Sequence, residues 1–281
     1  MTVLDARVSE VSRRLRSRAD GILAAVWYMP EASTGYAGIP LSSATASLAS
    51  RAACLGAVRG EVAGALLAPI NPVGVARAVD EAWVVTTPEA LLAARLECSV
   101  AHLERVLGPA PDGLERANEL LLSAATAGTT EGHPVYAGLR EIGFPGTPMG
   151  DLWRACDLVR ERRGDSHRNT WVAAGFDPVE INVLTELWRD VPIGSVATNQ
   201  MGWSQRACDN AVVRLEAAGL VRGDALTDTG RVVRDDIEVA TDRQERAMVD
   251  TLGDDADELL EILAPWARVV ITSGPRPWEN P

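Results

Sequence analysis

The stretch WSQRACDNAVVRLEAAGLVRGDALTDTGR, residues 203–231, carries the clearest structural pattern in the carboxyl-terminal third of the chain. Ser204 is a typical helix-capping residue, and Gly219 supplies the left-handed conformation that commonly ends a helix. Between these two residues, apolar side chains recur at helical spacing along one side. The spacing predicts an amphipathic helix, and its exposed side carries Gln205, Arg206, Asp209, Asn210 and Arg214.

A very small hairpin and a long helix are predicted after this amphipathic helix. Residues 220–222 and 225–226 flank a Gly223-Asp224 turn, an arrangement that suits two short antiparallel strands. A helical pattern then runs from residue 227 towards residue 252, and another helix is predicted upstream over residues 177–188. The predicted order is therefore a helix, the amphipathic helix, a hairpin and a long helix. This is the order of elements in a winged helix.

The amino-acid sequence of this region resembles that of the MarR family of regulators. The run RLEAAGLVR at residues 214–222, followed by LTDTGR at residues 226–231, carries the resemblance. It implies a winged-helix regulator in which the second helix reads DNA. The residues that would contact the bases or phosphates are Gln205, Arg206, Asn210 and Arg214.

A narrower resemblance extends over the whole chain. The pair LW at residues 152–153 and the run RERRGDSH at residues 160–167 are similar to actinobacterial MarR-like proteins found near specialised-metabolism genes. In those proteins a long helical region precedes the winged helix. We therefore expect a ligand-responsive regulator whose residues 1–174 form a small-molecule pocket and a homodimer scaffold. The winged helix would read DNA or a protein partner.

Two features depart from the MarR pattern. MarR wings usually hold a longer hairpin with alternating Asp and Arg, whereas only three residues, 222–224, separate the short strands here. Residues 194–200, GSVATNQ, stand where a full supporting helix is expected, but they are short and polar. We therefore expect a minimal wing and a distorted turn between the two helices.

The charge of the chain opposes binding to nucleic acid. The net charge is −12 and the isoelectric point is near 4.8. Residues 177–250 contain fourteen carboxylates and eight arginines, a local net charge of −6. Because recognition of DNA depends on neutralising phosphates, DNA is a possible partner that the charge disfavours.

The rest of the chain is predicted to be helical, so the fold class is mainly α. A first helix is marked by Leu15, Ile22 and Val26 and ends before residue 29. Further helices are predicted over residues 41–55, 61–68, 72–83, 88–107, 113–127 and 147–174. A boundary near Gly175 would divide a helical domain, residues 1–174, from a degenerate winged helix with C-terminal helices, residues 175–281.

The run from Arg160 to His167 has two interpretations. In the functional one, Asp165 orients His167 as a general base, and Arg162 or Arg163 holds an anionic group in a pocket. In the structural one, the run is a solvated helix end broken by a glycine, and its charges pair with one another.

Aromatic residues near the amino terminus suggest a second place for a ligand. Trp27, Tyr28 and Glu31, together with Arg51, could line an aromatic pocket that carries both signs of charge. Trp153 would join this pocket, or it would fill the core as tryptophan at helical spacing commonly does.

The remaining motifs give little support to catalysis. The four cysteines lie far apart, without metal-ligand spacing, and His102 and His133 have no metal-spaced partner. The sequence holds no phosphate-binding glycine loop, no G-x-S-x-G and no H-E-x-x-H, so we expect neither a cofactor nor a metal. It also lacks a secretory signal and a membrane span, so a cytoplasmic protein is expected. The alternative function is an enzyme of specialised metabolism that keeps the winged helix only as a scaffold.

Overall fold

The computed structural model describes residues 3–24 and 36–273. The helices are α1 (Val3–Leu23), α4 (Ser43–Ala52), α5 (Gly60–Leu66), α6 (Pro72–Val85), α7 (Pro88–Leu107), α8 (Leu114–Thr126), α9 (Pro134–Ile142), α10 (Pro148–Ala173), α11 (Pro178–Trp188), α12 (Gln205–Ala217), α13 (Asp228–Gln244), α14 (Arg246–Leu252) and α15 (Ala256–Thr272). Two 3₁₀ turns, Ala53–Leu55 and Gly253–Asp255, continue α4 and precede α15. Strands β1 (Val221–Arg222) and β2 (Ala225–Leu226) form one antiparallel hairpin. The mainly α fold with a small hairpin is confirmed.

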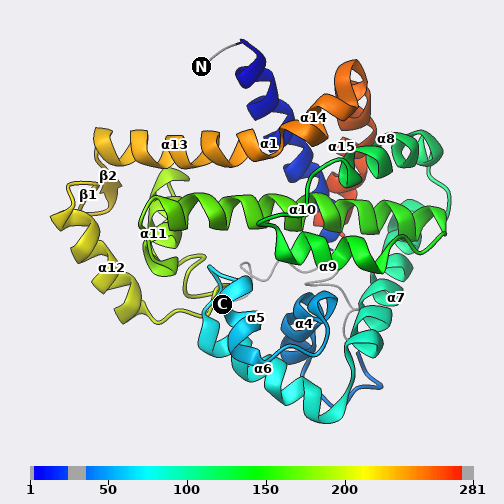
Figure 1. Cartoon of the computed structure of the whole chain (residues 1–281), viewed down its shortest axis with the longest axis horizontal. Helices are drawn as coiled ribbons and strands as arrows, with labels where there is room; N and C mark the ends of the chain where they lie inside the picture. Colours follow the sequence, from blue (N-terminus) through cyan, green and yellow to red (C-terminus); the bar gives the residue numbers. More distant parts are fainter. Residues whose placement is uncertain (1–2, 25–35, 274–281) are drawn as a thin grey trace.

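The central element is α10, a helix of 26 residues. In Figure 1 it crosses the middle of the molecule, with α13 above it and α9 below it, and it contacts both helices. Helices α1, α7 and α8 also pack against it, so that most of its side chains are buried, including several charged ones. A helix surrounded in this way must pair its charges internally, and this requirement shapes the sites described below.

The buried apolar side chains form a large core and a smaller one. The large core joins residues of α1 and α4–α10 to residues of α14 and α15, so the first and last described helices pack together. The smaller core lies among α11, α12 and β1. Helices α14 and α15 thus pack with the helical region, although they follow the winged helix in sequence. The division of the chain near Gly175 stays a prediction.

Several elements differ from the sequence-based expectation. Helix α9 was not predicted; it begins at Pro134, a residue suited to the first turn of a helix. Gly164 does not break α10, because packing on both sides outweighs its cost of about 1 kcal/mol in a helix. The expected long helix after residue 227 ends at Gln244, and α14 begins two residues later.

In the part of the chain that the structure describes, no helix is both long and apolar enough to cross a membrane. Nor do three or more potential metal ligands gather anywhere in residues 3–24 and 36–273.

Candidate functional site

Helix α11 is fixed at its start by a reciprocal pair of side-chain bonds. The Asp177 carboxylate accepts hydrogen bonds from the backbone N–H groups of Val179 and Glu180, at 2.8 Å each. The Glu180 carboxylate in turn accepts from the backbone N–H of Asp177 at 3.0 Å. This capping box satisfies N–H groups that have no partner within the helix. Both carboxylates therefore have structural roles before any contact with α12 is considered.

A single buried carboxylate organises the segment between α11 and α12. Glu186, 1% exposed, accepts hydrogen bonds from the backbone N–H groups of Gly194, Val196 and Ala197 at 2.6–2.8 Å. Residues 193–201 consist of turns, as the polar sequence there predicted, and a regular supporting helix is absent from this described segment. The Glu186 carboxylate holds in place the loop that stands where a supporting helix would stand.

Helix α12 begins and packs as its sequence predicts. The Ser204 hydroxyl accepts a hydrogen bond from the backbone N–H of Ala207 at 3.2 Å, which caps the helix. Cys208, Ala211 and Leu215 are buried in the smaller core. The opposite side is exposed, and Figure 1 places α12 at the edge of the molecule. The position leaves the outer face of α12 open to a partner.

The four residues expected to read DNA are not equally available. Gln205 donates to the Asp209 carboxylate at 2.9 Å. The Arg214 guanidinium pairs with Asp177 at 2.5 Å and with Glu180 at 2.6 Å, so it ties α12 to the cap of α11. Arg206 and Asn210 are exposed, and their side chains make no hydrogen bond or ion pair to the described part of the chain. These two side chains are the ones that a bound molecule could engage without breaking another contact.

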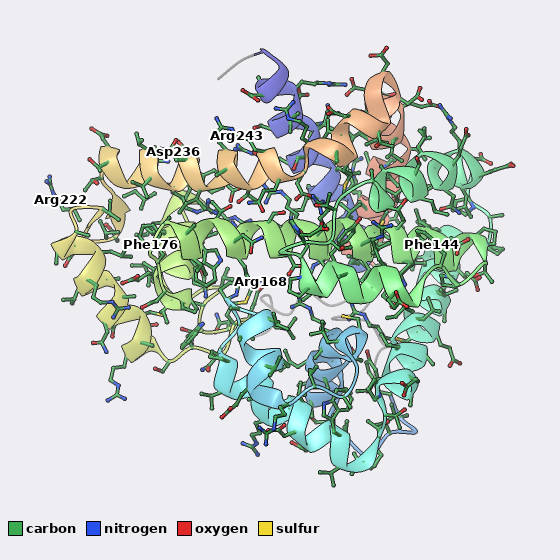
Figure 2. All side chains as sticks on the ribbon, in the orientation of Figure 1. Phe144, Arg168, Phe176, Arg222, Asp236 and Arg243 are labelled. Carbon is green, nitrogen blue, oxygen red and sulfur yellow. The ribbon has the colours of Figure 1, made fainter. Side chains whose placement is uncertain are left out.

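The hairpin is as small as the sequence predicted. Val221 pairs with Leu226 and Arg222 pairs with Ala225 across the ladder. Figure 2 shows Arg222 at the outer edge of the molecule. Behind the hairpin, a Cβ atom added to Gly230 would lie 1.9 Å from the Leu220 carbonyl oxygen, so only glycine allows α13 to approach the hairpin so closely.

Arg162 and Arg163 lie inside the molecule rather than at a solvated helix end, so the structural interpretation of their run as exposed was wrong. The Arg162 guanidinium donates to the carbonyl oxygens of Thr129 and Gln244, at 2.7 Å each. Arg163 pairs with Glu238 at 2.8 Å and with Asp242 at 2.5 Å, both on α13. Arg163 and both of its carboxylate partners lie inside the molecule, so Arg163 is not available to a ligand in a pocket.

Asp165 and His167 do not contact each other. The Asp165 carboxylate accepts from the backbone N–H of Tyr136 at 3.0 Å and pairs with Arg168. The His167 Nδ1 atom faces the Thr241 hydroxyl on α13, at 3.4 Å. Two residues along a helix correspond to a turn of about 200°, so the side chains point to opposite sides of α10. The expected orientation of His167 by Asp165 is not present.

The protonation of His167 yields a prediction for acid stability. Burial, reinforced by the charges of Arg234 and Arg163, lowers the pKa of His167 to about 3 against the opposing pull of Glu238. The ordinary pKa is about 6.5, so this contribution to stability is complete above pH 6.5 and is lost as the pH falls towards 3. At about pH 5 the loss is about 2 kcal/mol. We expect His167→Asn to reduce the acid-induced loss of stability by about this amount, as measured by urea unfolding between about pH 7.5 and about pH 5. Parallel pH profiles for the two proteins would contradict the lowered pKa of His167.

The second expected ligand site is only partly described. Arg51 pairs with Glu161 at 2.8 Å, and Trp153 is 1% exposed in the large core. Trp27, Tyr28 and Glu31 lie outside the described residues. Arg154 stacks over the Trp153 ring at 5.5 Å, and its Nε and Nη1 atoms meet no hydrogen-bond acceptor within the described part of the chain. The structure thus brings Arg51 to α10 and buries Trp153 in the core.

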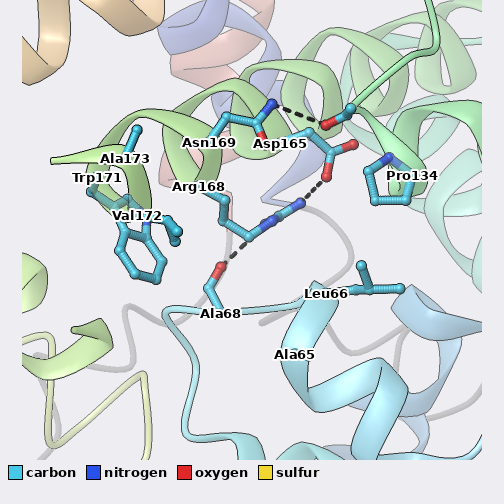
Figure 3. Close-up of a pocket in the computed structure, with 11 residues that line it drawn as sticks. Ala65, Leu66, Ala68, Pro134, Asp165, Arg168, Asn169, Trp171, Val172 and Ala173 are labelled. Atoms are coloured by element: carbon cyan, nitrogen blue, oxygen red, sulfur yellow. Dashed lines mark hydrogen bonds and ion pairs between the residues drawn. The ribbon is translucent and has the colours of Figure 1, made fainter. Parts of the chain in front are cut away.

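A cavity of about 350 Å³ lies between α5 and α10. Its lining includes Leu66, Ala68, Pro134, Trp171 and the Asp165–Arg168 ion pair. Figure 3 shows the Arg168 side chain between the Trp171 ring and the Asp165 carboxylate. Arg168 also donates to the Ala68 carbonyl oxygen at 3.1 Å. Arg168 was not among the site residues predicted from the sequence, since nothing in its local pattern places it opposite a residue a hundred positions away.

The loop after Ala68 connects this cavity to the segment that precedes α12. The Pro69 carbonyl oxygen accepts hydrogen bonds from the Trp203 indole at 2.9 Å and from the Asn182 amide at 3.2 Å. The backbone N–H of Asn71 donates to the Met201 carbonyl oxygen at 2.8 Å, and the Asn71 amide donates to that of Gly202 at 2.8 Å. Residues 68–71, hereafter the linking loop, therefore contact both the cavity and the start of α12.

Comparison with known proteins gives one match. A family model described as "Helix-turn-helix family" matches residues 12–277. Comparison with curated proteins and with solved structures finds no match. The match extends through the helical region as well as the winged helix, so it concerns the arrangement of nearly the whole chain.

Proposed function

This chain belongs to the helix-turn-helix family, and from that premise we propose that it is a cytoplasmic, ligand-responsive regulator of the MarR-like type that binds duplex DNA weakly through α12. The outer face of α12 supports this proposal, because it presents side chains that can contact bases. Arg206 and Asn210 stand there exposed and unengaged with the described residues, at the edge of the molecule. A guanidinium suits the acceptors of guanine in the major groove, and an amide suits adenine.

The charges around α12 account for the weakness. Asp209 lies on the same face as Arg206 and Asn210 and would repel phosphates. Arg214 forms ion pairs with Asp177 and Glu180. Few cations remain to neutralise phosphates, so affinity rests on a small number of base contacts and on low salt. A homodimer that presents two copies of α12 to neighbouring half-sites would compensate for this weakness.

The alternative, an enzyme of specialised metabolism, would need Asp165 and His167 in one site. Their side chains point to opposite sides of α10, and the half-buried His167 has a pKa lowered to about 3. The geometry therefore favours the regulator over the enzyme.

The proposal predicts a loss of DNA binding when both unengaged side chains are removed. We expect Arg206→Ala combined with Asn210→Ala to weaken binding to the duplex upstream of this protein's own gene by about 30-fold or more, because each base contact contributes about 1–3 kcal/mol. Fluorescence anisotropy at low and moderate salt measures the effect. Arg77→Ala is the matched control, since Arg77 is an exposed arginine on α6 and its removal changes the net charge equally. An absent salt-sensitive signal for the unaltered protein, or equal affinities for both variants, would refute DNA reading by α12.

A further inference from the structure

We infer that the cavity between α5 and α10 is the effector site of this protein. Its ligand is a neutral and mostly apolar molecule that carries a hydrogen-bond acceptor. The linking loop transmits the binding of this ligand to α12. The transmission rests on the proposed reading of DNA by α12, whereas the binding does not. The cavity volume of about 350 Å³ lies at the lower end of the range for small-molecule sites, about 300–1,000 Å³.

The lining determines the class of ligand. Leu66, Ala68, Pro134 and Val172 supply apolar surface. The one ion pair in the lining joins Asp165 to Arg168, so the charges of the described lining cancel. A charged ligand would find no unpaired opposite charge in this lining. A neutral molecule needs none.

The hydrogen-bonding groups of the lining favour an acceptor on the ligand. Trp171 is 3% exposed, and its indole N–H meets no acceptor within the described residues. A buried donor without a partner is uncommon and unfavourable. A ligand whose carbonyl or ether oxygen reached this N–H would satisfy the donor, while the rest of the ligand would pack against the apolar side chains.

The connection to α12 passes through a chain of hydrogen bonds. Arg168 holds the Ala68 carbonyl oxygen from the cavity side. The next residues of the linking loop bind Trp203, Met201 and Gly202, which immediately precede the capping residue of α12. Ala68 and Trp171 also pack together with Ile181 of α11 and Ile237 of α13. A ligand that moves Arg168 or Trp171 would thus shift the elements that position α12.

Binding and transmission can be tested separately with three small aromatic probes of similar size. Acetophenone is neutral and carries a carbonyl, benzoate is an anion, and benzylammonium is a cation. In protein labelled with 5-fluorotryptophan, acetophenone should shift the fluorine resonances of Trp171 and Trp203, assigned by Trp171→Phe and Trp203→Phe. Benzoate and benzylammonium should bind at least about tenfold more weakly. No shift at Trp171 with acetophenone, or equal shifts with the charged probes, would overturn the effector site.

The transmission is tested by Asn71→Ala, which removes the side-chain bond to Gly202 and lies outside the cavity lining. In this variant acetophenone should still shift Trp171, but the shift at Trp203 and the effect of acetophenone on DNA affinity should both be reduced, because one of the bonds that join the linking loop to residues 201–203 is gone. An unchanged response at Trp203 would overturn the transmission. If DNA binding is never observed, the proposed function fails while the fluorine spectra still decide whether the cavity binds the probe.

Discussion

Replacing Glu186 with Ala is expected to lower the free energy of unfolding by about 3–5 kcal/mol, because three backbone N–H groups, two of them buried, would lose their acceptor at once, and a buried group costs about 1–3 kcal/mol when unpaired. The three groups belong to Gly194, Val196 and Ala197, which form the loop between α11 and α12. Urea unfolding measures the change. Hydrogen exchange should in addition show lost protection at these three amides.

A set of glutamate variants separates this anchoring role from a general effect of charge. Glu97→Ala removes an exposed glutamate in the middle of α7 and should change stability by no more than about 0.5 kcal/mol. Glu186→Gln keeps one acceptor oxygen and should fall between the unaltered protein and Glu186→Ala. If Glu186→Ala and Glu97→Ala have similar stabilities, the loop does not depend on the Glu186 carboxylate.

Local signals were sufficient to predict the elements that begin and end with strong caps. The helix predicted over residues 88–107 is found with those bounds, and the Thr87 hydroxyl accepts from the backbone N–H of Ala90 as a cap should. The hairpin around Gly223 and the cap at Ser204 are also confirmed. These features depend on residues within a few positions of each other, and the sequence displays such features directly.

The polar interior could not be predicted in the same way, because its partners are distant in sequence. Glu161 meets Arg51 from 110 residues away, and Arg168 meets the Ala68 carbonyl oxygen from 100 residues away. A segment rich in charged residues is interpreted as exposed when the partners of those charges are unknown. The segment around Arg163 was therefore interpreted either as an exposed helix end or as a ligand site. The same limit hid Glu186, whose three partners lie in a loop of unpredictable shape.

A polar contact joins α1, α10 and α13. Asp242 is fully buried and pairs with Arg163 at 2.5 Å and with Arg13 at 2.7 Å. Glu238 pairs with Arg163 and with Arg234. The contact thus contains three arginines and two carboxylates. Removing a carboxylate increases the excess of positive charge, whereas removing an arginine balances the two signs.

We therefore expect Asp242→Ala to destabilise the protein by about 3–5 kcal/mol, the usual cost of leaving buried charge uncompensated. Arg163→Met should cost less, because Asp242 keeps Arg13 and Glu238 keeps Arg234. In the double variant the Arg163 charge is gone, so the two losses should not add, and the coupling energy should be about 1–3 kcal/mol. Urea unfolding of the two single variants and the double variant completes the cycle. Additive losses, or a larger loss for Arg163→Met than for Asp242→Ala, would show that net charge does not control the stability of this contact.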